Sequence, residues 1–317
     1  PIALVSEEAL VRFEYPFGIK HTDPGRMVAG SLEGRVKITG PNGLIIWGKN
    51  FWYDEASMNI YSDHEVQFAY EDHRGQARGI EMKLIPAAAK PKELKPAVEG
   101  IREIVLRHNV HMKLAIKKNP EPSETGPSRF ATVKSGSFTF NLETNQGTFK
   151  DDVRVYHPTS PQHADTLQCD TLELQFVRKD ETGNTMPQTG HSSGKLTFEE
   201  LIATGSTVTL ISEENQFTGT MTRLLYNEVT KTIVMQDQQA VRIFQQSSEL
   251  QCPEITINQD QEGRLQTVFC KGVGFIKHRD PASGQLLMAA QWVDHMKKST
   301  DPESGLEMVE LEKDCIV

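Results

Sequence analysis

A short pattern of apolar and small residues recurs along the chain. An apolar residue is followed two positions later by a small residue, and after a gap of two come two apolar residues separated by one position. Internal repetition of this kind is the first guide to a fold. The clear copies are Ile46/Gly48/Phe51/Tyr53, Ala77/Gly79/Met82/Leu84, Val133/Ser135/Phe138/Phe140, Leu167/Cys169/Leu172/Leu174 and Leu250/Cys252/Ile255/Ile257.

Each copy changes the face on which its apolar side chains lie. In an extended strand Leu167 and Cys169 share one face, whereas Leu172 and Leu174 fall on the opposite face. A straight strand would turn half of this apolar set toward water. The pattern therefore predicts a strand that bends or bulges just after the small residue, where two backbones can approach closely. Chance apolar pairs in an ordinary β protein are the alternative, but they explain a shared change of face poorly.

Regular alternation of apolar and polar residues predicts further strands. The alternation is longest between residues 104 and 116, where it predicts one long strand with a single buried side. The apolar face of that strand is formed by Ile104, Leu106, His108, Val110, Met112, Leu114 and Ile116.

Polar breaks that contain Asp63, Asp151 with Asp152, and Asp237 interrupt other alternating stretches. The short carboxylate of Asp can accept hydrogen bonds from nearby backbone amides, so it suits such a break. Helix signals are weak and are confined to residues 91–100, 197–202 and 291–298.

Strands that keep turning corners predict an all-β protein, an elongated antiparallel β-jellyroll in which two folded sheets, a "β-taco", bring their apolar faces together. The open ends of such a body can pair with another copy or a related domain. We expect an N-terminal segment, a first jellyroll segment, a Pro-rich loop, a second jellyroll segment with a polar insertion at 178–195, and a charged tail. Their bounds are 1–24, 25–118, 119–128, 129–297 and 298–317.

Composition narrows the possible partners. The formal net charge of −9 disfavours general binding of nucleic acid, because phosphates need a basic field. No run of about twenty apolar residues is present, so no helical membrane span is expected. The chain begins at Pro1 without a Met, which suggests a piece of a longer protein whose signal or anchor lies upstream.

The four cysteines are too few and too scattered for a disulfide scaffold. Cys169 and Cys252 occupy the small position of the repeat, so we expect buried thiols chosen for their size. A disulfide between Cys252 and Cys270 is the alternative.

No set of catalytic residues can be assembled, and we expect no enzyme activity, no cofactor and no metal. His108 and His111 are three residues apart, which places them on opposite faces of a strand. Asp151 and Asp152 suit a solvated turn better than an acid–base pair. The segment Gly272–Gly274 lacks the strand-to-helix context and the third glycine of a dinucleotide loop.

Three stretches of the chain resemble the OstA-like family of Gram-negative envelope proteins, which includes the LptA and LptC types of lipopolysaccharide-transport proteins. The style of the motifs is most like the large OstA-like proteins of planctomycete-type bacteria, and the similarity spans roughly residues 36–293. The motifs are Gly136–Asn141 with Gly147–Val155 and Ala164–Leu174, Leu224–Asn227 with Ile233–Asp237 and Leu250–Ile257, and Phe51–Asp54 with Ile60–Asp63 and Ala77–Met82.

The resemblance implies a periplasmic β-jellyroll whose apolar interior receives the acyl chains of lipopolysaccharide or another glycolipid. Its expected partners are other Lpt components or further copies of itself, stacked end to end. Outer-membrane assembly is the implied process, and any membrane attachment would come from an anchor outside this chain. The chain departs from the family in its length, about twice that of a single such domain, which suggests two fused jellyroll segments.

The residues expected to line a lipid groove are the inward-facing apolar side chains of the predicted strands. Whether the groove is open or is a closed core cannot be read from the pattern, and a structural or adhesive β-module that binds polysaccharide through exposed Trp47, Trp52 and Trp292 is the alternative function. The predicted lining residues are Leu106, Val110, Met112, Leu114, Phe138, Phe140, Phe149, Val153, Leu172, Leu174, Leu224, Tyr226, Ile233, Met235, Ile255 and Ile257.

Overall fold

The computed structural model confirms the all-β class. The described strands pair with one another in antiparallel fashion, and no α-helix occurs among the described residues. The helix predictions at 197–202 and 291–298 are wrong, because the first stretch lies within a strand and the second contains the end of one strand, a bend and the start of the next. Residues 91–97 lie outside the described part. None of the described segments forms a helix that could cross a bilayer. The structure describes residues 3–15, 25, 27–40, 43–86, 98–115, 130–179, 195–300 and 306–316.

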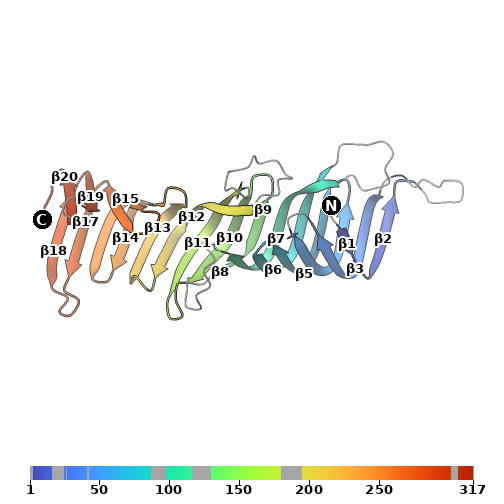
Figure 1. The fold of residues 1–317 in the computed structure, drawn as a ribbon, viewed down its shortest axis with the longest axis horizontal. Helices are drawn as coiled ribbons and strands as arrows, with labels where there is room; N and C mark the ends of the chain where they lie inside the picture. Colours follow the sequence, from blue (N-terminus) through green and yellow to red (C-terminus); the bar gives the residue numbers. More distant parts are fainter. Residues whose placement is uncertain are drawn as a thin grey trace. The chain divides into compact units, whose positions relative to one another are not determined.

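The chain divides into two compact units, each with its own interior. Most strands of each unit lie beside strands that are near them in the chain (Figure 1). The expectation of two consecutive family-type segments stays a prediction. Unit 1 comprises Pro1–Lys117, Thr132–Asp151 and Val177–Thr197, and unit 2 comprises Lys118–Ala131, Asp152–Phe176 and Phe198–Val317.

The strands of the first half of the chain include two short ones, β1 and β2, in the segment for which the sequence predicted no structure. Both pair with β3. These strands are β1 (Ala3–Val5), β2 (Glu8–Phe13), β3 (Met27–Thr39), β4 (Ile45–Asp54), β5 (Asn59–Tyr70), β6 (His73–Pro86), β7 (Val98–Ala115), β8 (Phe130–Ser135), β9 (Ser137–Asn141) and β10 (Gln146–Pro158).

The strands of the second half continue into the charged tail, where β20 pairs with β19. They are β11 (Ala164–Lys179), β12 (Lys195–Ser212), β13 (Phe217–Asn227), β14 (Thr232–Gln245), β15 (Ser248–Gln259), β16 (Leu265–Lys271), β17 (Gly274–Arg279), β18 (Leu286–Trp292), β19 (His295–Thr300) and β20 (Glu307–Glu312).

The predicted corners are present. The register between neighbouring strands shifts where the repeat changes face, for example between Trp47 and Trp52 in β4 and between Gln76 and Arg78 in β6. Burial changes parity at the same place: Ala77 is buried before the corner of β6, and Ile80 after it. A three-residue step through the corner therefore keeps both apolar sets on the inside of the bend.

Strands with a tight corner alternate with strands that have a wide, polar corner. In the wide type the buried residues on the two sides are four apart, as Ser62 and Val66 in β5 and Phe149 and Val153 along β10. Polar residues fill the gap, and both Asp151 and Asp152 have positive φ. The interval between successive copies of the repeat, such as those that start at Val133 and Leu167, thus corresponds to one antiparallel pair of strands, one of each type.

Strand β7 also turns a corner, contrary to the prediction of a straight strand with one buried side. Asn109 has a φ of 52°, and His108 is exposed although its neighbours in the alternation, Leu106 and Val110, are buried. Because the two buried positions are four apart in the sequence, the period of two continues through the bend. Ile116 lies outside the described residues.

Several corners divide what is one strand in the pattern into two. β15 pairs with β17 before its corner and with β16 after it, and Gly272, with a φ of 87°, stands between those two partners. Trp292 lies against this corner, where its Nε1 donates to the carbonyl of Gly272 at 2.9 Å. Its exposed fraction is 1%, so the expectation of an exposed Trp292 is wrong.

The small residues of the repeat do more than leave space. Ser135 Oγ donates a hydrogen bond to the carbonyl of Ser137 at 2.9 Å. In the same way, Cys252 Sγ donates to the carbonyl of Glu254 at 3.3 Å. Each contact spans the bend from the residue before it to the residue after it. A short polar donor at this position therefore adds a hydrogen bond to the carbonyl two residues later.

The buried thiols are free, and two of them are hard to ionise. Cys169, Cys252 and Cys270 are buried and form no disulfide. The expectation of buried free thiols at Cys169 and Cys252 is confirmed, and the alternative disulfide between Cys252 and Cys270 is absent. Burial raises the pKa of Cys169 to about 12, with a smaller contribution from Asp170. A hydrogen bond with Cys252, followed by burial, raises the pKa of Cys270.

We expect Gly79→Ala to lower the free energy of unfolding by about 1–2 kcal/mol, because Gly79 turns the corner of β6 with a φ of 79° that an L side chain adopts at a cost. Urea unfolding measures the change. Gly100→Ala is the matched control, since its Cβ would meet nothing closer than Ile85 Cδ1 at 3.8 Å. Equal midpoints for the two variants would contradict a strained corner.

We expect a thiol reagent at pH 8 to modify only Cys315 in the native protein and all four cysteines in urea, because only Cys315 is exposed. Mass spectrometry of the alkylated protein counts and locates the modified sites. Native-state modification of Cys169, Cys252 or Cys270 at the rate of Cys315 would show that these corners open readily.

Candidate functional site

In unit 2 the inward-facing residues nearest the corners form a buried floor. Leu224, Met235, Ile255 and Cys270 are direct cross-strand neighbours on β13, β14, β15 and β16. None of them is more than 4% exposed. Met296 on β19 continues the row beside Cys270 and is buried as well.

The next inward-facing row lies two residues farther from the corners and is only half-buried. It consists of Tyr226, Ile233, Ile257 and Val268, again as direct cross-strand neighbours. Burial thus decreases from the bend toward the strand ends, as expected for two sheet halves that splay apart. We call this feature the unit 2 trough, and the four residues its mouth row.

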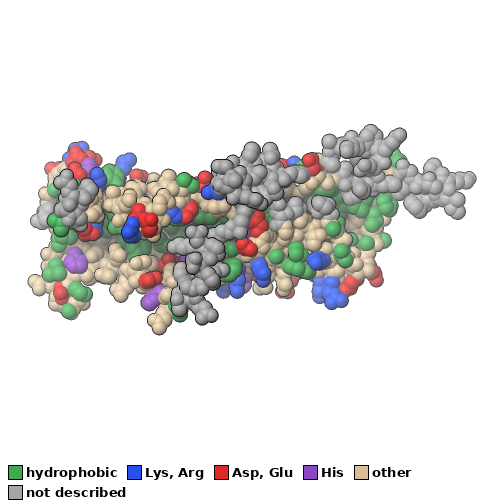
Figure 2. Space-filling view, in the orientation of Figure 1, with side chains coloured by type: hydrophobic (Ala, Val, Ile, Leu, Met, Phe, Trp, Pro, Cys, Tyr) green, Lys and Arg blue, Asp and Glu red, His purple; other side chains and the backbone are tan. Residues whose placement is uncertain are grey.

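The other sheet half of unit 2 shows the same gradient only in part, because Ile243, the cross-strand neighbour of Leu250, is buried. Val208, Val241 and Cys252 are buried next to the bend. One step farther out, Leu250 on β15 and Ile276 on β17 are cross-strand neighbours and are half-buried. Figure 2 shows hydrophobic side chains recessed between two more polar rims in the part of the molecule formed by β12–β15.

Aromatic rings and one charged group lie at the rim of the trough. The ring of Phe198 stacks on Tyr226, with centroids 6.3 Å apart, and meets Phe176 edge-on at 6.2 Å. Tyr226 Oη donates to a carboxylate oxygen of Glu228 at 2.5 Å, and Glu228 also pairs with Lys231. Burial and then this hydrogen bond raise the pKa of Tyr226, so its phenol stays neutral at physiological pH.

Unit 1 has a more completely filled interior. Leu106, Phe138 and Phe149 are buried cross-strand neighbours on β7, β9 and β10, and the two Phe rings lie 4.4 Å apart. At the strand ends the ring of Tyr70 packs on Phe140 at 5.9 Å, which joins the two sheet halves. Aromatic side chains therefore fill this interior.

Arg178 helps to close unit 1, and nothing in the sequence pattern indicated this role. The residue was expected in an exposed insertion, yet it lies at the end of β11 and is 7% exposed. Its Nη2 donates to Tyr70 Oη at 2.6 Å, and its Nη1 lies 3.7 Å from Glu71. Residues 180–194 of the expected insertion lie outside the described part.

Most of the predicted lining residues are buried, and a minority are half-exposed. The half-exposed ones are Leu114 in unit 1 and Tyr226, Ile233 and Ile257 in unit 2. Val268, Cys270 and Phe198 complete the trough but were missed, although the alternation of Val268 and Cys270 could have revealed the first two. The buried predicted residues are Leu106, Val110, Met112, Phe138, Phe140, Phe149, Val153, Leu172, Leu174, Leu224, Met235 and Ile255.

Polar clusters in the described part of the chain are explained by structural pairing. Asp152 pairs with Arg154 at 2.9 Å, and Asp237 accepts hydrogen bonds from the amides of Gln239 and Ala240 at 2.8 and 3.1 Å. Three possible metal ligands, Asp294, His295 and Glu312, come within 4.8 Å of one another. His295 Nδ1 lies 3.1 Å from Glu312, and so this group has the geometry of an ion pair.

Comparison with known proteins gives one family. Residues 132–263 match the family model described as "LptA/(LptD N-terminal domain) LPS transport protein". No curated protein matches the chain. One similar solved structure is LptH, "the LptA homologous periplasmic component" of the lipopolysaccharide transport device from Pseudomonas aeruginosa. It is 11% identical, and the alignment covers 57% of this chain and 94% of LptH with a TM-score of 0.31. Residues 132–263 are therefore similar to the LptA/LptD N-terminal family, as their motifs predicted.

Proposed function

We propose that the chain is a periplasmic component of lipopolysaccharide transport and that the unit 2 trough holds the acyl chains of its glycolipid cargo. The observation on which this depends is the half-buried mouth row above a buried apolar floor. The family match over residues 132–263, which includes most of the trough, supports the type of cargo. The predicted lining residues remain part of the proposal.

The mouth row suits a saturated chain because three of its four residues are aliphatic and the hydroxyl of the fourth, Tyr226, is already bonded to Glu228. It crosses four strands, a span of about 14 Å at the usual strand spacing. Each methylene removed from water there contributes about 0.8 kcal/mol. Contact along an aliphatic row would hold a chain firmly without fixing its position, so the lipid could slide from one site to the next.

The alternative function is a structural or adhesive β-module of the envelope without lipid. Trp292, one of the three tryptophans expected to bind polysaccharide, is buried, whereas Trp47 is 42% exposed. A test that separates the two functions must change the inside of the trough and leave the outer face intact. Adjacent residues of β14 offer this contrast.

We expect Ile233→Asp to reduce lipid affinity at least tenfold, because a carboxylate in the mouth row would have to lose its hydration when a chain binds. Displacement of a fluorescent fatty acid measures the affinity, and native mass spectrometry measures lipid that co-purifies. Val234→Asp is the matched control, since Val234 is also half-buried but faces the opposite side of the same strand.

Two outcomes would contradict the proposal. One is equal lipid binding by wild type, Ile233→Asp and Val234→Asp, and the other is the absence of measurable lipid in wild type. Urea midpoints of both variants separate loss of binding from loss of folding.

We also propose that the ends of the chain pair with further β-domains, either other Lpt components or a second copy. Among the described strands β2 pairs only with β3, so its outer edge is open. All of its residues are exposed, including Leu10 at 73% and Val11 at 41%. At the other end Met308 and Val309 of β20 are 51% and 56% exposed. A contact between two different ends is head-to-tail and leads to open filaments.

We expect the double variant Leu10→Lys and Val11→Lys to abolish concentration-dependent association of the purified protein, because lysines on an edge strand oppose pairing. Light scattering after size exclusion measures the mass. Met308→Lys with Val309→Lys, on exposed residues of β20, tests the opposite end. Wild type that stays monomeric at the highest concentration would exclude self-stacking and leave only other proteins as partners.

A further inference from the structure

The outer face of unit 1 holds a hollow that lies on the opposite side of the sheet from the buried interior. Its volume is about 870 Å³. Ile46 and Met112 face inward and are buried, so Trp47 and Lys113, their neighbours in sequence, face outward. The hollow is therefore a surface site that does not involve the trough.

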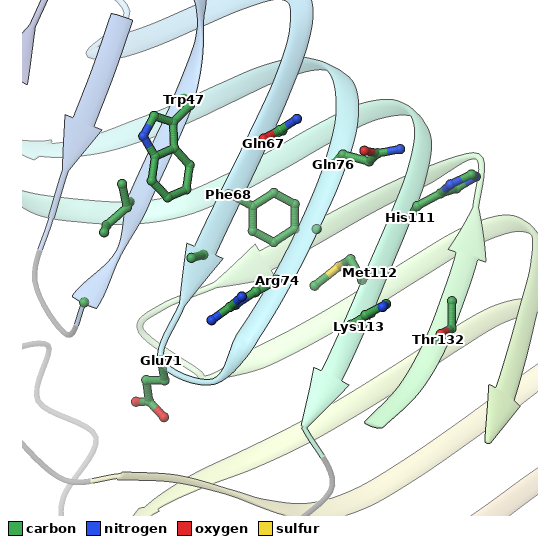
Figure 3. A pocket seen from close by; sticks show the side chains of 14 residues that line it. Trp47, Gln67, Phe68, Glu71, Arg74, Gln76, His111, Met112, Lys113 and Thr132 are labelled. Atoms are coloured by element: carbon green, nitrogen blue, oxygen red, sulfur yellow. The ribbon is translucent and has the colours of Figure 1, made fainter. Parts of the chain in front are cut away.

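Two rows of cross-strand neighbours form the base of the hollow, on β4, β5, β6 and β7 in turn. Figure 3 shows the first row and the two cations of the second. The first row is Trp47, Gln67, Gln76 and His111, and the second is Ile45, Ala69, Arg74 and Lys113.

The second row ends in two like charges that face each other. Arg74 and Lys113 are direct cross-strand partners, both exposed. Like charges in this position are destabilising. The ion pairs seen among the described residues include neither of them, and Glu71, the carboxylate at the edge of the hollow, is within ion-pair distance of Arg178. A bound anion between Arg74 and Lys113 would convert the repulsion into a pair of favourable contacts.

The charge of this face differs from that of the whole chain. The chain has a net charge of −9, yet basic side chains predominate on the outward positions that surround the hollow. Glu65 is exposed on the same face opposite Arg78. The further exposed cations are Lys37, Lys49, Arg78 and Lys134.

The side chains of the first row are of the kinds that bind sugars. Trp47 offers an exposed apolar ring face, and the amides of Gln67 and Gln76 each provide donors and an acceptor next to it. A flat ring, fixed amides and a pair of cations match a sugar that bears a negative group. A simple phosphate would leave the indole and both amides unused.

We propose that the hollow on β4–β7 binds an anionic sugar chain, with Trp47 stacked on a sugar ring, Gln67 and Gln76 bonded to its hydroxyls, and Arg74 with Lys113 holding a phosphate or carboxylate of the chain. This site does not depend on lipid carriage by the trough. The sugar chain can belong to a glycolipid head group or to a free polysaccharide, since the same groups are presented by both.

Isothermal titration calorimetry of the full chain with oligogalacturonate, and with maltohexaose as the uncharged comparison, tests the proposal. We expect oligogalacturonate to bind more tightly, with an affinity that falls as salt rises. Arg74→Ser with Lys113→Ser, and separately Trp47→Ala, should each lower the affinity at least tenfold. Lys49→Ser is the matched control, because Lys49 lies on the same face outside the hollow, and its affinity should change less than twofold.

Three results of the calorimetry would overturn the proposal: no binding by wild type, undiminished binding by the Arg74/Lys113 double variant, or an equal loss in Lys49→Ser, which would show a general charge effect. Phosphatidylglycerol vesicles bound as tightly as the sugar chain would assign the face to a membrane surface instead. The urea midpoint of the double variant should equal or exceed that of wild type, which excludes misfolding.

Binding of an anionic glycolipid and of its deacylated sugar chain distinguishes the two sources. Equal affinities identify the sugar chain alone as the ligand of the hollow. Binding only of the intact glycolipid, with loss in Ile233→Asp and not in the Arg74/Lys113 double variant, would assign that ligand to the trough and overturn the site. Failure of Ile233→Asp to affect lipid binding bears only on the proposed transport function.

Discussion

The structure depends on one constraint: apolar side chains on both sides of a bend must reach the same interior. A strand that alternates regularly cannot meet this demand with a three-residue step, so the backbone bulges at the corner and a small residue lets the bend close. Ser135 and Cys252 satisfy a carbonyl two residues later, which ties the side-chain chemistry of the corner to its geometry. Because each corner buries apolar residues on two sheet halves, the repeat stabilises the fold pair by pair along the chain.

The same constraint explains why one repeat can give a filled core or an open trough. The corner fixes only the residues next to it, and burial at the strand ends depends on the volume and contacts of the side chains there. In unit 1 the rings of Tyr70 and Phe140 meet, and Arg178 bonds to Tyr70, so the strand ends are joined. In unit 2 the corresponding places hold aliphatic residues such as Ile233 and Ile257, which stay half-exposed.

Sequence reasoning predicted the tight corners because a three-residue step breaks the alternation visibly. It missed the corner of β7 because the four-residue step from Leu106 to Val110 preserves the period, and exposed His108 was taken for a buried residue. Arg178 was missed for a different reason: a charged residue next to a polar insertion reveals nothing of a tyrosine far away in sequence. The helix assigned to 291–298 failed because a corner between β18 and β19 imitates helical spacing.

The basic outer face of unit 1 differs in sign from the net charge of the chain. A net charge of −9 argues against anionic ligands in general, yet strand pairing places Arg74 opposite Lys113 beside an exposed tryptophan. These two residues are far apart in the sequence, so only the register of β6 and β7 brings them together. Charge of one sign concentrated on one sheet face acts on a ligand within about a Debye length, roughly 10 Å, whereas acidic groups farther away than this are largely screened. Local register rather than total charge therefore decides which ligands a sheet face can attract.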